Sequence, residues 1–413
     1  PITDFTRIRE ASFLWTYGSS PYAGDMLHLP PLVLAVLSPL AGTPAPLWSL
    51  AFFFVFLQLF TAATIFGIGQ IYELGVESKE DCCLGGLALG DEQTEAEDFA
   101  RAAQDNDLVD DAQIEVEFIR VRGRKSGAGL VALIYFLNPY CILTCVGLST
   151  LVVDHLFLAS AILAAMQGKQ RTVGQSMAVA ILLSPYALTL LPPVCLLLER
   201  SHRQHSLASS VYAVCKWTLV LVVMCCAIMA TIVPMHRALE WVRPVYEFTF
   251  TVPDLTPNVG LFWYFFIEIF DHFKSFFLFI FQYSMLLYPL PLALRLRHRP
   301  AFLAVLTLGI MAVFKSYPSI GDAALYMPML VIFHQSLSDM RRMFILAQIF
   351  LFVSVLAPFF WDAWIVTGAG NANFYYALTL AYGIAQVMIL SEALLAVLRA
   401  DKRGRFRLFL KEQ

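Results

Sequence analysis

Long apolar runs separated by short polar stretches make up most of this chain. A membrane-spanning helix needs about 20 largely apolar residues, or about 17–25 when it is tilted. By that measure, the pattern predicts an all-α polytopic membrane protein that forms a single domain over residues 1–413. Eleven candidate spans lie at about 46–70, 127–148, 151–167, 173–185, 187–199, 209–233, 272–293, 301–316, 322–339, 343–366 and 374–399.

The segment 173–199 is interrupted by Ser184-Pro185-Tyr186, so it forms either one kinked helix or an outward and a returning helix. Proline removes a helix hydrogen bond, and in lipid that break is tolerated only against protein or a wet cavity. The basic residues favour the hairpin, because every basic cluster then lies on one side of the membrane. The positive-inside rule makes that side, and with it the C-terminus, cytoplasmic. The clusters are Arg120–Lys125, Lys169–Arg171, Arg200–Arg203, Arg295–Arg299, Arg341–Arg342 and Arg399–Arg407.

Eleven spans before a cytoplasmic C-terminus place Pro1 on the non-cytoplasmic side. The chain begins without an initiator Met or a signal peptide. A protein inserted from the cytosol needs one further helix ahead of Pro1 to reach that topology. We therefore expect twelve spans in the complete protein, with Pro1 luminal.

The segment 71–126 is the one long polar loop, and it holds fifteen acidic and six basic residues. Runs such as Asp91–Asp98 have too little hydrophobicity to fold alone. We expect a partly disordered cytoplasmic loop, and the alternative is a docking site for a basic partner.

The composition agrees with a membrane protein and excludes several other classes. Apolar residues make up 59% of the chain and charged residues 14%, whereas globular proteins have about 45–50% and about 25%. A net charge of −3 gives no general affinity for nucleic acid. Most of the eight cysteines lie in apolar runs, and Cys82-Cys83 has no partner at metal-ligand spacing, so we expect no bound metal or cofactor.

Two non-cytoplasmic loops carry candidate acid–base groups. Residues 20–32 precede an apolar run that is too short to span, which predicts an interfacial or re-entrant luminal helix. Asp25 and His28 in this loop form either an acid–base pair or, as we favour, a plain surface pair. In the loop and helix of residues 250–273, Thr256 or Asn258 is placed to cap the helix. Three groups would lie close together on that helix, either for proton or metal chemistry or, as we favour, as a wet polar face: Glu268, Asp271 and His272.

Two further loops offer polar groups to a ligand. Lys315 either faces a phosphate or pairs with Asp322. Asn371 and Asn373 lie on a glycine-rich turn beside aromatic residues, where they either bind a sugar or polar lipid head, or Asn373 caps the next helix. No nucleophile or phosphate-loop motif is present. The residues alone indicate a multispan protein whose luminal loops suit a lipid-linked polar ligand.

The block Phe250–Phe273 resembles the signature of the PIG-U family, the polytopic subunit of the glycosylphosphatidylinositol (GPI) transamidase. Further blocks resemble the family in the same order along the chain: Ser20–Tyr22, Leu137–Leu143, Phe314–Tyr326 and Asn371–Ala377. The resemblance implies a GT-C-like bundle in the endoplasmic reticulum membrane, similar to the dolichol-phosphate-mannose-dependent mannosyltransferases.

The resemblance also implies a role. The complex cleaves a C-terminal signal from a proprotein and joins the new carboxyl end to the ethanolamine of the GPI glycolipid. Its nucleophilic cysteine belongs to PIG-K, its other subunits are PIG-S, PIG-T and a GPAA-type protein, and PIG-U presents the lipid without catalysing the reaction. The family's GPI-contacting asparagines map onto Asn371 and Asn373, and an anionic membrane phospholipid maps near Arg203 and His205.

Two other functions are compatible with these residues. A dolichol-phosphate-sugar-dependent glycosyltransferase of the same fold would need an acidic base in the first luminal loop, where Asp4, Glu10 and Asp25 lie outside any acidic pair. A lipid or ion transporter would use the intramembrane pair Asp154-His155, which we expect to face the bundle interior. Transport also requires a matched pair of broken helices, and the sequence shows none.

Overall fold

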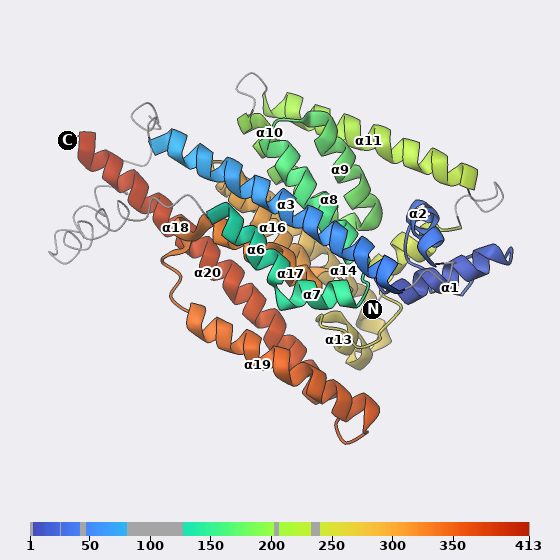
Figure 1. Ribbon diagram of the computed structural model, residues 1–413. Coiled ribbons are helices and arrows are strands. Elements are labelled where there is room, and N and C mark those ends of the chain that lie inside the picture. The colour runs from blue at the N-terminus through green and yellow to red at the C-terminus, as the bar shows by residue number, and fades with distance from the viewer. Residues whose placement is uncertain are drawn as a thin grey trace.

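The computed structural model describes residues 3–24, 26–41, 47–80, 127–201, 206–232 and 240–412. Within these ranges the chain is helical (Figure 1), and its β-type pairing is limited to an isolated bridge between Asp4 and Ser149. The predicted all-α class is therefore confirmed.

The described helices follow one another along the two halves of the chain. The N-terminal half contains α1 (Phe5–Thr16), α2 (Pro31–Ala41), α3 (Leu47–Glu80), α6 (Gly127–Leu137), α7 (Pro139–Val146), α8 (Leu151–Met166), α9 (Gln170–Leu183), η1 (Pro185–Leu190), α10 (Leu191–Ser201) and α11 (Leu207–Ile232). The C-terminal half contains η3 (Arg243–Glu247), α12 (Phe248–Thr251), α13 (Phe262–Glu268), α14 (Asp271–Leu287), α15 (Pro289–Arg295), α16 (Pro300–Phe314), α17 (Ile320–Leu330), η4 (Val331–Phe333), α18 (His334–Leu337), α19 (Met343–Trp361), η5 (Asp362–Val366) and α20 (Ala372–Glu412).

Five helical segments among the described residues are long and apolar enough to cross a membrane: Trp48–Leu74, Leu207–Met229, Asp271–Arg295, Met343–Val366 and Ala372–Arg403. The pair α6 and α7, bent by 46°, makes a sixth when counted as one span. The chain is therefore a multi-pass membrane protein. The other predicted spans correspond to shorter helices. Helix length and composition thus identify five or six spans among the described residues, and the predicted count of eleven is not confirmed.

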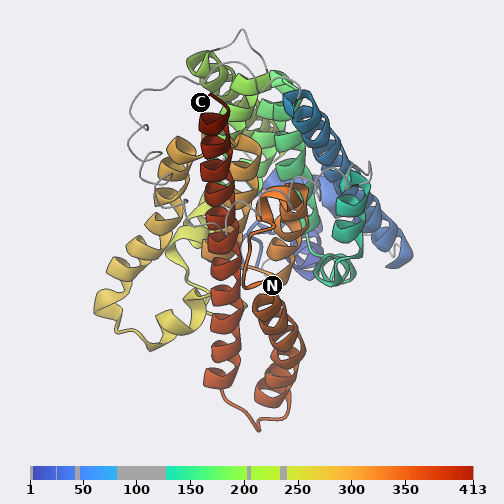
Figure 2. The same cartoon turned by 90° about the vertical axis from the view of Figure 1, so that its left-hand side faces the viewer.

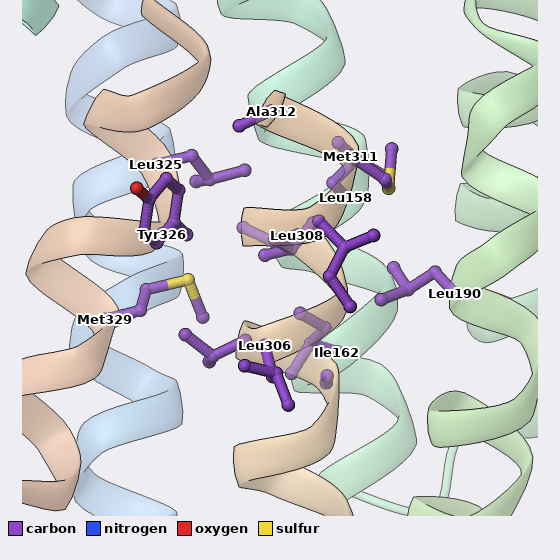
Figure 3. Close-up of a cluster of buried hydrophobic side chains, with 14 of the residues drawn as sticks. Leu158, Ile162, Leu190, Leu306, Leu308, Met311, Ala312, Leu325, Tyr326 and Met329 are labelled. Carbon is purple, nitrogen blue, oxygen red and sulfur yellow. The ribbon is translucent and has the colours of Figure 1, made fainter. Parts of the chain in front are cut away.

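Helix α16 lies at the centre of the bundle and is buried on all sides from Phe302 to Val313. Figure 3 shows Leu306, Leu308 and Met311 of this helix among side chains of α8 and α17 and Leu190. A helix that is apolar all round is expected to be a buried one. Its hydrophobic run therefore reports packing against protein, whereas most side chains of α19 remain exposed.

The segment around Pro185 forms a hairpin within the bundle. The chain leaves along α9, turns at η1 and returns along α10. The return is shown by a hydrogen bond of 2.9 Å from Ser201 Oγ, at the end of α10, to the backbone oxygen of Ala165, near the end of α8. Pro185 begins η1, where its missing N–H breaks no helix bond. The predicted out-and-back path of the chain is confirmed.

Ion pairs join several basic clusters at one end of the bundle. Arg297 Nη2 lies 3.0 Å from Glu199 Oε1 at the end of α10, and Arg299 Nε lies 2.6 Å from Asp401 Oδ1 near the end of α20. Arg403 pairs with Asp339, in the loop before α19. Arg200 donates to the carbonyl of His298, and Arg342 pairs with Glu392 of α20. Together these contacts link four of the predicted basic clusters, those at 200, 295–299, 341–342 and 399–403.

The predicted loop 71–126 and three of the candidate site residues lie partly or wholly outside the described residues. Helix α3 continues to Glu80, so the first ten residues of the predicted loop 71–126 are helical. The remainder of that loop, residues 81–126, lies outside the described ranges, as do Asp25, Arg203 and His205.

Candidate functional site

The four polar loops lie at the end of the bundle opposite the basic clusters. Helices α16 and α20 each connect the two ends: α16 begins beside Arg299 and ends at Lys315, and α20 runs from Ala372 past Arg403. Figure 2 shows the start of α20 and its neighbour α19 projecting beyond the rest of the helices. The four loops are therefore far apart in the sequence but lie on one surface of the bundle.

Direct contacts join the first three loops. Arg7 of α1 donates to the carbonyl of Met26 at 3.1 Å, and its Nη2 lies 3.8 Å from Asp254 Oδ2. The backbone N–H of Asp254 donates to the Tyr317 hydroxyl at 3.2 Å. Burial raises the pKa of Tyr317 well above its usual range, so this hydroxyl stays neutral. The Phe248 ring stacks on Tyr317 with centroids 5.1 Å apart.

Gly260 allows the second and third loops to touch. A Cβ at this position would lie 2.6 Å from Cγ of Pro318 and 2.8 Å from Oδ1 of Asn258. That oxygen already accepts a hydrogen bond from the Gly260 N–H at 2.7 Å. Only glycine therefore fits between the loop of residues 253–260 and the turn that precedes α17.

A cavity of about 520 Å³ opens between α13, η5 and the first turn of α20. This volume is within the about 300–1,000 Å³ common for small-ligand sites. Both predicted asparagines line it. The lining consists of Pro257, Trp263, Tyr264, Ile267, Glu268, Trp364, Ile365, Asn371, Ala372 and Asn373.

Asn371 caps α20 and keeps one amide group for a ligand. Its Oδ1 accepts hydrogen bonds from the backbone N–H groups of Asn373 and Phe374, at 3.0 and 3.3 Å. Because this bonding requires the oxygen to face the helix, the Nδ2 donor points away from it. The described residues provide no partner for that donor. The capping residue is therefore Asn371, and the alternative in which Asn373 caps this helix was wrong.

Asn373 is tied to α13 by a side-chain hydrogen bond. The Tyr264 hydroxyl donates to its Oδ1, and Tyr376 on the next turn of α20 donates to the carbonyl of Leu261 at 3.3 Å. Partial desolvation and the neighbouring Glu268 carboxylate raise the pKa of Tyr264, so this hydroxyl remains a donor. The Nδ2 of Asn373, like that of Asn371, has no partner in the described part of the chain.

Aromatic rings form the wall of the cavity. Trp263 is 1% exposed and stacks on Trp364, with centroids 6.0 Å apart and planes 24° apart. Trp361 and Tyr375 extend this cluster behind the wall. The Trp263 Nε1–H has no acceptor among the described residues. The wall is thus apolar, and the Trp263 donor without an acceptor is buried within it.

Trp364 was not among the residues predicted for the site. It lies in the π-helix η5, which follows α19 and ends at a turn where Gly368 has φ +67°. The Gly370 N–H donates to the Ala363 carbonyl at 2.8 Å, which folds this turn back beside η5. A tryptophan next to a glycine-rich turn was the available signal, and π-helical turns are frequent at functional sites.

The acidic cluster predicted on one helix is not formed. Helix α13 ends at Glu268, the extended residues Ile269 and Phe270 follow, and α14 begins at Asp271. Neither Thr256 nor Asn258 caps α13, because its N-cap residue is Leu261. In the described part of the chain, no group of three or more His, Cys, Asp or Glu side chains is placed to hold a metal ion.

Lys315 pairs with Asp322, which confirms the second of its two predicted roles. Asp322 also accepts from the Ser319 N–H at 2.7 Å, so it completes the capping box of α17. Asp154 and His155 are both buried in the bundle, as predicted. Of the acids considered for a glycosyltransferase, Asp4 caps α1 through a 2.9 Å hydrogen bond from the Thr6 N–H.

Comparisons with known proteins agree with the resemblance. The family model described as "GPI transamidase subunit PIG-U" matches residues 1–382. The "GPI-anchor transamidase component PIGU" of Homo sapiens is 31% identical over 404 residues, which cover 97% of this chain and 87% of the relative. The "GPI transamidase component GAB1" of Saccharomyces cerevisiae is 32% identical over 273 residues, 66% of this chain and 67% of the relative. The chain therefore belongs to the PIG-U family of GPI transamidase subunits.

Proposed function

We propose that this protein is a non-catalytic subunit of the GPI transamidase and binds the GPI glycolipid in the cavity between α13, η5 and the start of α20. In this role it presents the lipid to the subunit that attaches it to proproteins. The observation that carries the proposal is the pair of asparagines, Asn371 and Asn373, whose side-chain amides lie in the cavity with unused donors.

The chemistry of the cavity suits an amphipathic ligand. The two amide groups match the hydroxyl and phosphate oxygens of a glycan head. Exposed apolar side chains continue from the same rim: Ile267 and Ile365 line the cavity and are each 50% exposed, and Phe374 is 55% exposed. A ligand with a polar head and acyl chains can therefore place its head on the amides and its chains along a lipid-facing surface.

The lining favours binding over chemistry. It contains one carboxylate and neither a cysteine nor a histidine. Attack on a peptide carbonyl requires an activated nucleophile with a base within hydrogen-bond reach. This agrees with the family resemblance, which implies that the catalytic cysteine belongs to PIG-K and that this chain works in a complex with PIG-K, PIG-S, PIG-T and a GPAA-type subunit.

The same proposal orients the protein in the endoplasmic reticulum membrane. The end that gathers Arg297, Arg299 and Arg403 would be cytoplasmic, and the cavity would open toward the lumen. An anionic phospholipid near Arg203 and His205 stays a prediction from the sequence.

The test uses variants that separate capping from ligand binding. Asn371→Asp keeps an oxygen to cap α20 but removes the Nδ2 donor, and Asn373→Asp likewise keeps the acceptor for Tyr264. We expect the double variant to assemble into the complex while its affinity for GPI and its anchor attachment fall by roughly tenfold.

Asn258→Asp is the matched control, because its oxygen also accepts a backbone hydrogen bond but the side chain lies outside the cavity lining. Equal GPI affinity and attachment in the double variant and the wild type would overturn the assignment. A loss of the same size in Asn258→Asp would show that added charge, rather than the site, is responsible.

A further inference from the structure

Glu268 is the one charged residue in the lining of the cavity. It ends α13, its side chain is exposed, and it forms no ion pair with a described residue. The two asparagines explain how the cavity binds neutral and anionic oxygens, but they give no role to a carboxylate. Its polar neighbour is the Tyr264 hydroxyl, which carries no charge. The carboxylate is therefore available to pair with a cation.

The surroundings of Glu268 favour an organic cation over a metal ion. Tyr264, one turn earlier on α13, and Trp364 on η5 line the same cavity. The faces of tyrosine and tryptophan rings attract ammonium groups. A bare metal ion would need several oxygen ligands, and the lining offers a single carboxylate.

We propose that Glu268, with the rings of Tyr264 and Trp364, recognises a primary ammonium group in the head of the glycolipid. This inference rests on the proposed function, because it assigns a specificity-determining residue within the same site. A GPI head carries primary amines on its amino sugar and on its ethanolamine, so the recognised chemistry has two sources within one ligand.

Binding to the Glu268 carboxylate would affect the two amines of the glycolipid differently. A nearby negative charge favours the protonated form of an amine, and an ammonium ion has no lone pair to attack a carbonyl. The ethanolamine nitrogen must lose its proton before it attacks the proprotein carbonyl, and the new amide bond replaces the bond from that carbonyl to the C-terminal signal, which leaves. The amine that stays bound to Glu268 during the reaction is therefore that of the amino sugar. This contact anchors the head while the ethanolamine reaches the catalytic subunit.

The experiment measures binding to the complete transamidase complex in lipid nanodiscs. Four probes are compared: glucosaminyl-phosphatidylinositol, its N-acetyl derivative, a phosphoethanolamine-bearing mannoside and its N-acetyl derivative. Acetylation removes the charge and keeps the rest of each probe. The proteins are the wild type, Glu268→Gln, and Asp271→Asn as a matched control, because Asp271 is an exposed carboxylate three residues away that does not line the cavity.

We expect the wild type to bind at least one amine probe roughly tenfold more tightly than its acetylated form. Glu268→Gln should bring that ratio close to one, and Asp271→Asn should leave it unchanged. The ratio should also fall as salt is added, since an exposed ion pair is screened. A preference confined to one pair of probes supports the inference and identifies the amino sugar or the ethanolamine as the source.

A ratio in Glu268→Gln equal to that of the wild type overturns the inference. The inference is also overturned if the wild type binds the amine probes and their acetylated forms equally well. If that binding still depends on Asn371 and Asn373, the proposed function remains intact. If no probe, and no intact GPI, binds the wild type in a manner that depends on these asparagines, the proposed function fails as well.

Discussion

The hydroxyl of Tyr264 donates a hydrogen bond to Oδ1 of Asn373, 109 residues further along the chain. The bond joins α13 to the first turn of α20, on the two sides of the cavity. It also fixes the amide of Asn373, since the oxygen is held by the hydroxyl and the nitrogen is left for a ligand. Tyr264 is thereby a positioning residue for the site.

Tyr264→Phe should weaken GPI binding without preventing assembly of the complex. The variant keeps the ring and removes the bond that orients Asn373, so we expect the dissociation constant to rise about three- to tenfold. The measurement is GPI affinity of the purified complex. Tyr283→Phe is the control, because Tyr283 is exposed on α14 and lies outside the cavity lining. Unchanged affinity in Tyr264→Phe would show that Asn373 needs no such support.

Gly260→Ala should destabilise the surface on which the loop of residues 253–260 meets the turn before α17. The added Cβ would overlap the rigid ring of Pro318, so one loop has to move, at a cost of about 1–3 kcal/mol. The check is thermal unfolding of the purified complex. In the control, Gly129→Ala, the nearest atom to the new Cβ is 3.9 Å away and the site is helical, so stability should be unchanged or higher. Equal losses in both variants would contradict the close approach.

The sequence predicts helices more reliably than it predicts their surroundings. The runs of α16 and α19 are similarly apolar, yet α16 is buried at the centre of the bundle and α19 contacts mainly α20. Hydropathy describes a side chain and not its neighbours, so it does not distinguish an apolar run that packs against protein from one that remains exposed. The hairpin at Pro185 was predicted from the basic clusters along the whole chain, because they all lie on one side of the membrane only if the chain turns back there.

For the site, the resemblance identified Asn371 and Asn373, and the structure places both in the cavity lining. Trp364 had only a weak signal, a tryptophan next to a glycine-rich turn, since its place depends on the π-helical turn at Asp362–Val366 and the fold of the next turn. The interruption of the helix at Ile269 and Phe270 also has no local signal, because neither residue is a proline or glycine. As a result, Glu268 was grouped with Asp271 rather than with the asparagines.

Asp401→Ala should destabilise the end of the bundle that holds the basic clusters. The Asp401 side chain is 9% exposed and accepts from both Arg299 Nε and His298 Nε2 at 2.6 Å. Its removal leaves a half-buried guanidinium without its carboxylate, and we expect a loss of about 2–3 kcal/mol. Thermal unfolding of the complex measures it.

Two companion variants test the reason for that loss. Arg297→Ala breaks a more exposed pair, with Glu199, and should cost less than about 1 kcal/mol. Adding Arg299→Ala to Asp401→Ala should restore part of the stability, because the unpaired charge is then removed. Additive losses in the double variant would show that the two side chains do not interact.

The hairpin and the proposed orientation predict which surface positions share a side of the membrane. Single cysteines replace Lys169, Arg297 and Tyr17 in a background whose accessible native cysteines are changed to serine. In sealed, right-side-out endoplasmic reticulum microsomes, an impermeant maleimide should label the cysteines at 169 and 297. It should label the cysteine at 17 only after the membrane is opened, because α1 lies at the end of the bundle that carries the polar loops, which the proposed orientation makes luminal.

Each alternative arrangement gives a different pattern. If residues 170–201 crossed the membrane once, the cysteines at 169 and 297 would lie on opposite sides, whereas the return of Ser201 to Ala165 requires the same side. If the positive-inside assignment were reversed, all three positions would exchange their labelling. Labelling of all three with detergent present is the control, since it shows that an unlabelled position was protected by the membrane and not by protein packing.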